Sequence, residues 1–322
     1  MAPKREGVLA RASQAERREA RRRAGSLDDF LVAPATRRRY TRAVAGYRSY
    51  CLAADGALPR SPEATDAAAA RYISYLWVNG DPRTLAGDVI SGLTLFAPAV
   101  KGRLRGSWRL LKAWGKAELP ARAPPFTAVL VYGLAERARQ KGWQDTMVAM
   151  LLAWHTWARP GEVFAAKCAH FAFTDALHAA WRLPATKSGA RTGTEEALVI
   201  ADPWLGRLLK AWAARRGPEA CLVDAPQQEH RRRLKVLCEE AQLDAGFRWY
   251  SFRRGGATHF FGETSNLGAC LVRGRWADAR TARIYLTEGL AKLSETAPSP
   301  HALAQLRAQA RRLRRDFSTA PQ

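Results

Sequence analysis

The segment TMVAMLLAWHTW, at residues 146–157, is apolar on nearly every face of a helix. A helix without a polar stripe has to be covered on all sides, so this segment predicts the central helix of a globular domain. Its apolar run, near Met147 to Trp154, is much shorter than the roughly 18 residues that a membrane helix needs. We therefore expect a domain built around this helix and no membrane partner.

A proline-rich stretch divides the chain into two expected domains. Residues 117–126, AELPARAPPF, contain three prolines and predict a linker. In residues 27–116, before the linker, apolar side chains recur at helical spacing, as at Tyr40, Tyr47 and Cys51, while the arginines fall largely on other faces. This pattern predicts a bundle of four or five helices with basic outer faces.

Local signals set the expected ends of these helices. Thr36 can cap the first, Asn79-Gly80 stops the second, and Pro82 and Thr84 begin the third. Residues 1–26 carry eight basic residues and three glutamates and almost no apolar side chains, so we expect a mobile or weakly helical basic tail. Such a tail fits an extra DNA contact, a nuclear address or a solvated arm.

The second domain is expected over residues 127–295, where two short alternating runs interrupt the helices. These runs, 169–183 and 195–200, are separated by the turn-like KSGARTG and predict a β-hairpin. The chain is therefore expected to be mostly α with a small β-hairpin sheet. Residues 296–322 predict a C-terminal amphipathic helix or tail, whose apolar face comprises Leu303, Leu306, Ala310 and Leu313.

The composition indicates a polyanionic partner. The chain has 52 Lys and Arg against 29 Asp and Glu, a net charge of +23 and a pI near 10.7; such an excess fits DNA or RNA phosphates. MAPKREG lacks a hydrophobic signal core, so we expect an intracellular, DNA-associated protein. The five scattered cysteines form no C-x-x-C pair, which predicts reduced core thiols and neither disulfides nor a zinc site.

Four residue types that suit phosphodiester chemistry, Arg, Lys, Tyr and Trp, occur in separate parts of the chain. Breaking a phosphodiester without metal or nucleotide requires a nucleophile, cations for the non-bridging oxygens and an acid for the departing 5′ oxygen. A tyrosine attacks well only where cations stabilise its phenolate, and arginine's donor fork matches phosphate oxygens. The candidate catalytic residues are Arg159 in HTWARPGEV, Lys187 in ATKSGARTG, Tyr250 and Arg253 in YSFRRGGATHFF, and Trp276 and Tyr285 in GRWADARTARIYL.

This constellation resembles the catalytic set of the tyrosine recombinases, or phage integrase family. The R-x-x-E pattern matches Arg159 and Glu162, and the family's H-x-x-R box matches Tyr250 to Arg253. The resemblance implies a helical core-binding domain, a DNA breaking-rejoining catalytic domain, and a C-shaped clamp on double-stranded DNA. It also implies Tyr285 as nucleophile, Lys187 as the acid on a hairpin with Arg191 as fallback, and no cofactor, metal or ATP.

One position departs from the family pattern, because Tyr250 stands where a histidine is usual. An uncharged phenol donates a hydrogen bond to phosphate but is a poor base. Chemistry could then be slower, or Lys187 and water could carry more of the proton transfer. His155 and His259 occupy apolar helical contexts and are expected to be packed core groups rather than replacement bases.

The expected DNA contacts and assembly complete the interpretation. In the family the C-terminal element docks on a neighbouring protomer, which implies subunit exchange in a tetrameric synapse; packing on its own domain and a basic DNA-contacting tail are the alternatives. A DNA-binding homologue without activity, a type IB topoisomerase or telomere resolvase, and a general nucleic-acid-binding protein also remain open. The residues expected to bind DNA are Arg37, Arg38, Arg39, Arg42, Arg105, Arg109, Arg191, Arg231, Arg232, Arg254 and Arg275.

Overall fold

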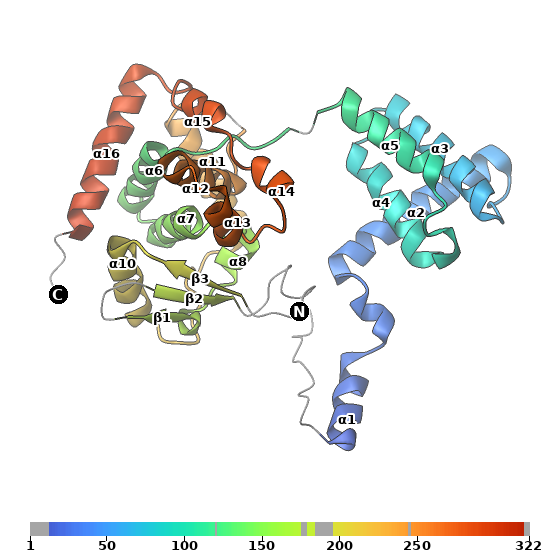
Figure 1. Cartoon of the computed structure of the whole chain (residues 1–322), viewed down its shortest axis with the longest axis horizontal. Helices are drawn as coiled ribbons and strands as arrows, with labels where there is room; N and C mark the ends of the chain where they lie inside the picture. The colour runs from blue at the N-terminus through green and yellow to red at the C-terminus, as the bar shows by residue number, and fades with distance from the viewer. Residues whose placement is uncertain (1–12, 120, 175–178, 184–195, 244–245, 319–322) are drawn as a thin grey trace. The chain divides into compact units, whose positions relative to one another are not determined.

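The computed structural model describes residues 13–119, 121–174, 179–183, 196–243 and 246–318 (Figure 1). The chain divides into two compact units, Met1–Ala121 and Arg122–Gln322, and the division lies inside the stretch expected to be a linker. Within that stretch Phe126 is fully buried in the second unit, so the end of the proline-rich segment is packed rather than free.

The first unit is a helical bundle. Its core includes Tyr47, Cys51, Ile73, Ile90 and Trp114, with α2 packed on α4 and α3 on α5. Its helices are α1 (Gln14–Ala24), η1 (Leu27–Phe30), α2 (Pro34–Asp55), α3 (Pro62–Val78), α4 (Arg83–Phe96), η2 (Pro98–Val100) and α5 (Arg105–Ala117).

One helix start in this unit differs from the sequence expectation. Helix α2 begins at Pro34 with Ala33 as its N-cap, because Pro34 supplies a preset φ at the first helical position; Thr36 lies inside the helix. Helix α1 buries no residue, although Ser13 and Glu16 form a capping box, so the described part of the basic tail is helical but unpacked. The predicted stop at Asn79 is confirmed.

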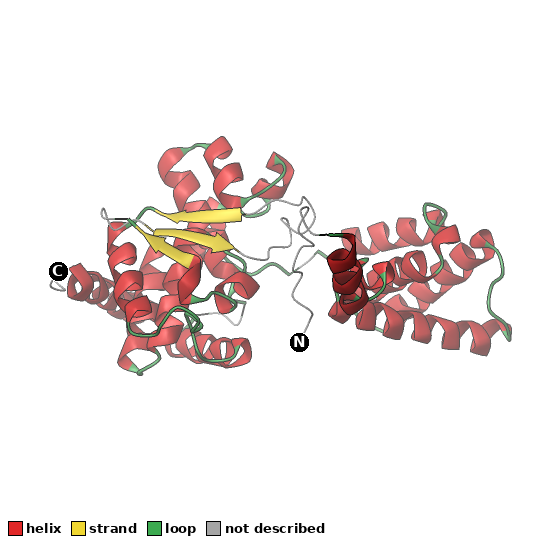
Figure 2. Cartoon of the chain, turned by 90° about the horizontal axis from the view of Figure 1, so that it is seen from below, coloured by secondary structure: helices red, strands yellow, loops and turns green. Residues whose placement is uncertain are grey.

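The second unit contains helices and one small sheet. In Figures 1 and 2 the three strands lie to one side of the helices of this unit. Its elements are α6 (Ala128–Gln140), α7 (Gln144–Thr156), α8 (Pro160–Phe164), η3 (Cys168–His170), β1 (Phe171–Phe173), β2 (Ala179–Leu183), β3 (Glu196–Ile200), α10 (Pro203–Ala214), α11 (Gln227–Glu240), α12 (Tyr250–Thr264), α13 (Leu267–Gly274), α14 (Ala279–Arg283), α15 (Glu288–Ser294) and α16 (Pro300–Ser318).

The sheet is antiparallel in the order β1-β2-β3. Strand β2 pairs with β3 so that Trp181 lies opposite Leu198, and both side chains are buried. The prediction of a mostly helical chain with a small β-hairpin sheet is confirmed. Helix α7 has every residue from Thr146 to Trp154 buried, which confirms it as the central helix.

Helix α12 crosses close to α7 because two consecutive glycines face it. A Cβ on Gly255 would lie 2.1 Å from the carbonyl oxygen of Phe126, and one on Gly256 would lie 2.3 Å from that of Trp154. No side chain fits at such distances. The close crossing brings the start of α12, which carries Tyr250 and Arg253, against the end of α7.

The C-terminal helix α16 packs on α6 of its own chain. Leu306 and Leu313 are fully buried, and Gly133 on α6 admits Leu306 at a distance that would clash with a Cβ. Arg137 donates to Gln309 at 2.8 Å, and Arg139 pairs with Asp316 at 3.0 Å. In this single chain α16 packs on its own domain, which is one of the alternatives considered from the sequence; exchange between protomers stays a prediction.

Several smaller expectations are corrected. His259 is exposed and pairs with Glu263 at 3.2 Å, and Cys221 is exposed while the other four cysteines are buried. Among the described residues, no helix has the length and apolar character required to cross a membrane.

Candidate active site

Arg159 is positioned by the break between α7 and α8. Helix α7 ends where Trp157 adopts the left-handed conformation, with φ 51°, and Pro160 then begins α8. Helix α7 therefore ends at Thr156, and Pro160 starts α8. Glu162 holds the turn: its carboxylate accepts from the backbone N–H of Arg159 at 2.7 Å and from Arg159 Nη1 at 2.9 Å.

Arg253 forms the buried floor of the site. Its side chain is 1% exposed; Nη1 donates to the carbonyl of Trp157, and Nη2 donates to that of Gly274 at 2.6 Å. Within the described ranges no carboxylate pairs with this guanidinium, and its Nε has no hydrogen-bond partner. Burial, and then the positive charge of Arg159, lowers the pKa of Arg253. A buried cation without an anion is costly, so this group is suited to receive one.

Tyr285 lies against Arg253 and two aromatic residues. Its ring stacks on Trp276, with centroids 4.6 Å apart, and the guanidinium carbon of Arg253 lies 5.4 Å from the centroid of each ring. Thr258 on α12 donates to the backbone carbonyl of Tyr285 at 2.9 Å. Tyr285 follows the short helix α14.

The hydroxyls of Tyr250 and Tyr285 are 2.6 Å apart. Burial and the hydrogen bond with Tyr285 raise the pKa of Tyr250 to about 12, although the charges of Arg253 and Arg159 act in the opposite direction. Tyr250 is therefore a neutral phenol at neutral pH. It can hold the Tyr285 hydroxyl or donate to an oxyanion, but it cannot serve as a base.

Tyr250→His is expected to introduce a protonation step into any reaction at this site. The pKa of Tyr250 lies far above neutrality, so its own protonation state does not change between pH 5 and 9, whereas a histidine titrates near about 6.5. DNA cleavage by the histidine variant should therefore change with pH near that value, and the tyrosine form should lack this step. Single-turnover cleavage measured across pH 5–9 checks this, with Tyr250→Phe as the control that cannot titrate; identical profiles for the three proteins would contradict it.

Two arginines expected to bind DNA are instead internal. Arg254 is 3% exposed and donates to the carbonyls of Ala123 and Ile284. Arg275 pairs with the carboxylates of Glu162 and Glu196, at 2.6 and 2.9 Å. The reason for the correction is burial, since neither guanidinium faces solvent. Lys187 and Arg191 lie outside the described residues.

The remaining arginines expected to bind DNA lie at or near the surface of their own units. Arg39 pairs with Asp88 at 2.5 Å and Arg232 with Glu229 at 2.7 Å, while Arg37 donates to the carbonyl of Asp28. The members of this group that are exposed without a described partner are Arg38, Arg42, Arg105, Arg109 and Arg231.

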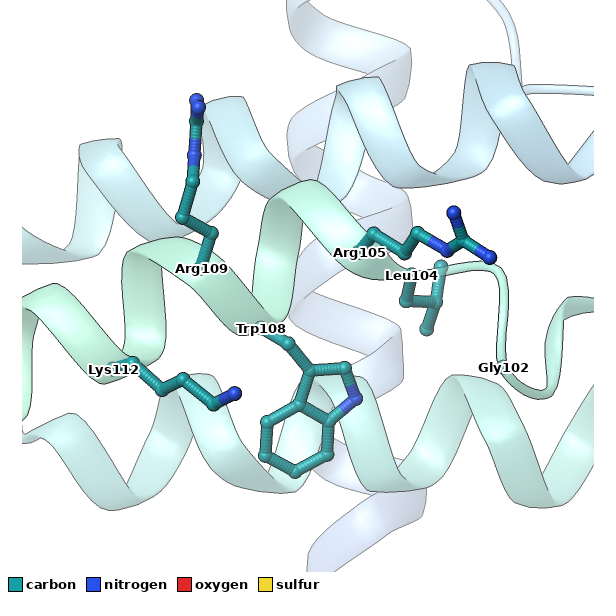
Figure 3. A pocket seen from close by; sticks show the side chains of 6 residues that line it. All are labelled: Gly102, Leu104, Arg105, Trp108, Arg109 and Lys112. Atoms are coloured by element: carbon teal, nitrogen blue, oxygen red, sulfur yellow. The ribbon is translucent and has the colours of Figure 1, made fainter.

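Helix α5 presents a basic face with an aromatic residue at its centre. Arg105, Trp108, Arg109 and Lys112 recur at helical spacing, and with Leu104 and Gly102 they line a hollow of about 400 Å³ (Figure 3). Figure 3 shows Trp108 and Lys112 on one flank of the helix and Arg109 on the other. Trp108 is 46% exposed. Trp108 and Lys112 are not among the residues that the sequence predicts to bind DNA. Their positions, three and seven residues after Arg105, are the signal that could have indicated them.

The described residues contain no group of three or more His, Cys, Asp or Glu side chains that could hold a metal ion. The six residues that the structure brings together are Arg159, Glu162, Tyr250, Arg253, Trp276 and Tyr285.

Comparison with known proteins gives matches at the level of structure alone. No family model matches the chain, and no curated protein matches it in sequence. The XerA recombinase is 16% identical, with a TM-score of 0.40 over 88% of this chain and 94% of that one. The XerH site-specific recombinase bound to its difH substrate, in a pre-cleavage complex, is 12% identical, with a TM-score of 0.41 over 73% of this chain and 76% of that one. A XerH post-cleavage complex is also 12% identical, with a TM-score of 0.43 over 70% and 74%. The chain is thus similar, at low identity, to solved structures of site-specific recombinases.

Proposed function

We propose that this protein is a tyrosine recombinase that cleaves and rejoins double-stranded DNA through a covalent phosphotyrosyl link. The observation that carries the proposal is Tyr285, whose ring lies against Arg253 and whose hydroxyl is held by Tyr250. Arg253 is a buried guanidinium that has backbone carbonyls but no described carboxylate as partners. A phosphodiester is the anion that would satisfy this cation while presenting its phosphorus to a phenol.

The reaction balances without an external energy source. The Tyr285 hydroxyl releases its proton to water as its oxygen forms a bond to phosphorus. The bond from phosphorus to the 5′ oxygen breaks, and the departing oxygen takes a proton, so the proton count is unchanged. The products are a 3′-phosphotyrosyl link and a free 5′ hydroxyl. A 5′ hydroxyl from a partner duplex reverses the step, because the phosphate bond energy is kept in the protein link.

Each residue of the site has a role in this scheme. Arg159 and Arg253 clamp the non-bridging oxygens, and Trp276 supports the Tyr285 ring by stacking on it. Tyr250 exchanges its hydrogen bond with Tyr285 for one to a phosphate oxygen. Lys187 is assigned as the acid for the 5′ oxygen on the sequence pattern.

A nicked suicide duplex tests the proposal, because loss of a short 5′-hydroxyl fragment prevents religation and traps the covalent adduct. Wild-type protein should accumulate a denaturant-resistant protein–DNA complex that maps to Tyr285. Adduct formation on two duplexes followed by strand exchange would indicate recombination in an assembled synapse, whereas relaxation of supercoils by a monomer would indicate a topoisomerase. Binding without any adduct would indicate a DNA-binding protein that lacks the chemistry.

We further propose that the basic face of α5 contacts the DNA backbone. Arginine and lysine side chains around an exposed tryptophan combine phosphate contacts with an apolar surface. This face belongs to the first unit, so its contribution to binding can be separated from chemistry in the second.

Arg105→Ala and Arg109→Ala should each reduce the salt dependence of DNA binding. Loss of one phosphate contact lowers the slope of log K against log salt by about 1. The affinity for every DNA sequence should fall by a similar factor. Fluorescence anisotropy over a series of salt concentrations measures the slope. Arg60→Ala, which removes an exposed charge elsewhere in the first unit, is the matched control; an equal loss in that variant would mean that binding depends on net charge alone.

A further inference from the structure

Arg275 joins carboxylates from two separate elements. Nη1 and Nη2 donate to the two oxygens of Glu162, at 3.1 and 2.6 Å, and Nη1 also donates to Glu196 Oε2 on β3 at 2.9 Å. The side chain is 9% exposed. Its backbone is left-handed, with φ 54°, a conformation that costs free energy in any residue except glycine. The bonds that its two Nη atoms make to Glu162 and Glu196 offset that cost, although its buried Nε has no described hydrogen-bond partner.

The Glu162 carboxylate is shared between Arg275 and Arg159. Arg159 reaches one oxygen with its side chain, at 2.9 Å, whereas Arg275 reaches both. If Arg159 were the only cation at this carboxylate, the ion pair would cancel the positive charge that a phosphate needs. Because Arg275 also balances Glu162, Arg159 keeps much of its attraction for a further anion.

The pKa directions agree with this sharing of charge. Burial alone would raise the pKa of Glu162, but hydrogen bonds from Arg275 and Arg159 outweigh it and lower that pKa. Burial would likewise lower the pKa of Arg275, and its bonds to Glu162 and Glu196 raise it instead. Both groups therefore stay charged at neutral pH.

Arg275 also precedes Trp276, the ring on which Tyr285 stacks. One guanidinium thus ties together α8, which begins directly after Arg159, the start of β3, and the backbone that carries Trp276.

We propose that Arg275 is a positioning residue that neutralises Glu162, so that Arg159 remains free to bind the scissile phosphate, and that fixes Trp276 beneath Tyr285. The proposal rests on the proposed function for the identity of the phosphate. It replaces the earlier expectation that Arg275 contacts DNA directly.

Arg275→Gly tests the proposal without backbone strain, since glycine accepts φ 54°. Covalent adduct formation on the nicked duplex should fall about 100-fold, because a small displacement of a catalytic group has effects of that order. DNA affinity should stay within about twofold, because Arg275 is buried and makes no direct contact. Arg275→Lys, which keeps the charge but loses the fork, should lose less activity.

The double variant Arg275→Gly with Glu162→Gln separates charge from packing. Removing the carboxylate frees Arg159, so the double variant should form the adduct at least about tenfold faster than Arg275→Gly alone. A variant that was damaged only in packing would not be rescued by a second change. Arg215→Ala, which removes an exposed charge on the same unit, is the control.

A second measurement does not depend on activity. In ¹³C NMR titration, the Glu162 carboxyl, assigned by its loss in Glu162→Gln, should titrate at higher pH in Arg275→Gly than in wild type. An unchanged titration, or a double variant with no recovery, would overturn the role of Arg275. Absence of any adduct in wild type would instead overturn the proposed function, while the titration would still decide whether Arg275 neutralises Glu162.

Discussion

We expect Tyr285→Phe to abolish covalent adduct formation on a nicked duplex while leaving DNA binding within about twofold of wild type. Removal of a nucleophile commonly costs at least about 10⁴-fold in rate, which places the variant below detection in a trapping assay. The ring should keep its place, because phenylalanine preserves the stacking on Trp276 and the contact with Arg253. Loss of the hydrogen bond to Tyr250 should lower the free energy of unfolding by about 1 kcal/mol.

The matched control for this variant is Tyr132→Phe, in the same unit. Tyr132 also loses one hydroxyl contact, to His155 at 2.8 Å, but that contact is outside the proposed catalytic set. Gel detection of the denaturant-resistant complex, followed by peptide mapping, distinguishes the two. A full adduct yield in Tyr285→Phe would mean that another residue is the nucleophile. Tyr250, whose hydroxyl lies 2.6 Å from that of Tyr285, would be the first to examine.

We expect Arg253→Lys to reduce cleavage by about 10³-fold, because a lysine keeps the charge but not the planar fork that would meet two phosphate oxygens. The guanidinium also binds the carbonyls of Trp157 and Gly274, so the variant should lose stability as well. Rapid-quench measurement of adduct formation at saturating DNA separates the chemical step from binding.

Arg254→Lys provides a benchmark for the structural part of that loss. Arg254 is the next residue on α12, is also buried, and also donates to backbone carbonyls, but it does not contact the Tyr285 ring. Its variant should lose comparable stability, measured by thermal unfolding, and at most about tenfold in adduct formation. Equal losses of activity in the two variants would mean that Arg253 acts only through the fold.

The sequence predicted the elements whose signals are local. The apolar pattern of residues 146–157 requires burial on all sides, and α7 is buried; the KSGARTG turn between alternating runs indicated the pairing of β2 with β3. The order and residue types of the motifs predicted a single site. The structure places its members together: Arg159, Tyr250, Arg253, Trp276 and Tyr285. What they do there remains a prediction.

Other features could not be read from one sequence because they depend on contacts between distant segments. An arginine in a basic stretch looks the same whether it faces DNA or carboxylates, so the pairing of Arg275 with Glu162 and Glu196 was not foreseeable. The direct hydrogen bond between the Tyr250 and Tyr285 hydroxyls depends on the packing of the segment after α14 against α12, where Thr258 donates to the Tyr285 carbonyl. Packing of α16 on α6 depends on Gly133 leaving room for Leu306, which periodicity does not reveal.

The glycine pair on α12 has a consequence for recognising relatives of this chain. Arg253 and Arg254 are held by backbone carbonyls, and Gly255 and Gly256 leave no room for a Cβ. Four successive positions therefore exclude most substitutions, the first two because of hydrogen bonds and the last two because of space. Divergence elsewhere can erase overall likeness while this tetrapeptide persists. A search seeded on RRGG, followed by an aromatic pair about 20 to 30 residues downstream, should therefore recover distant members that whole-chain alignment passes over.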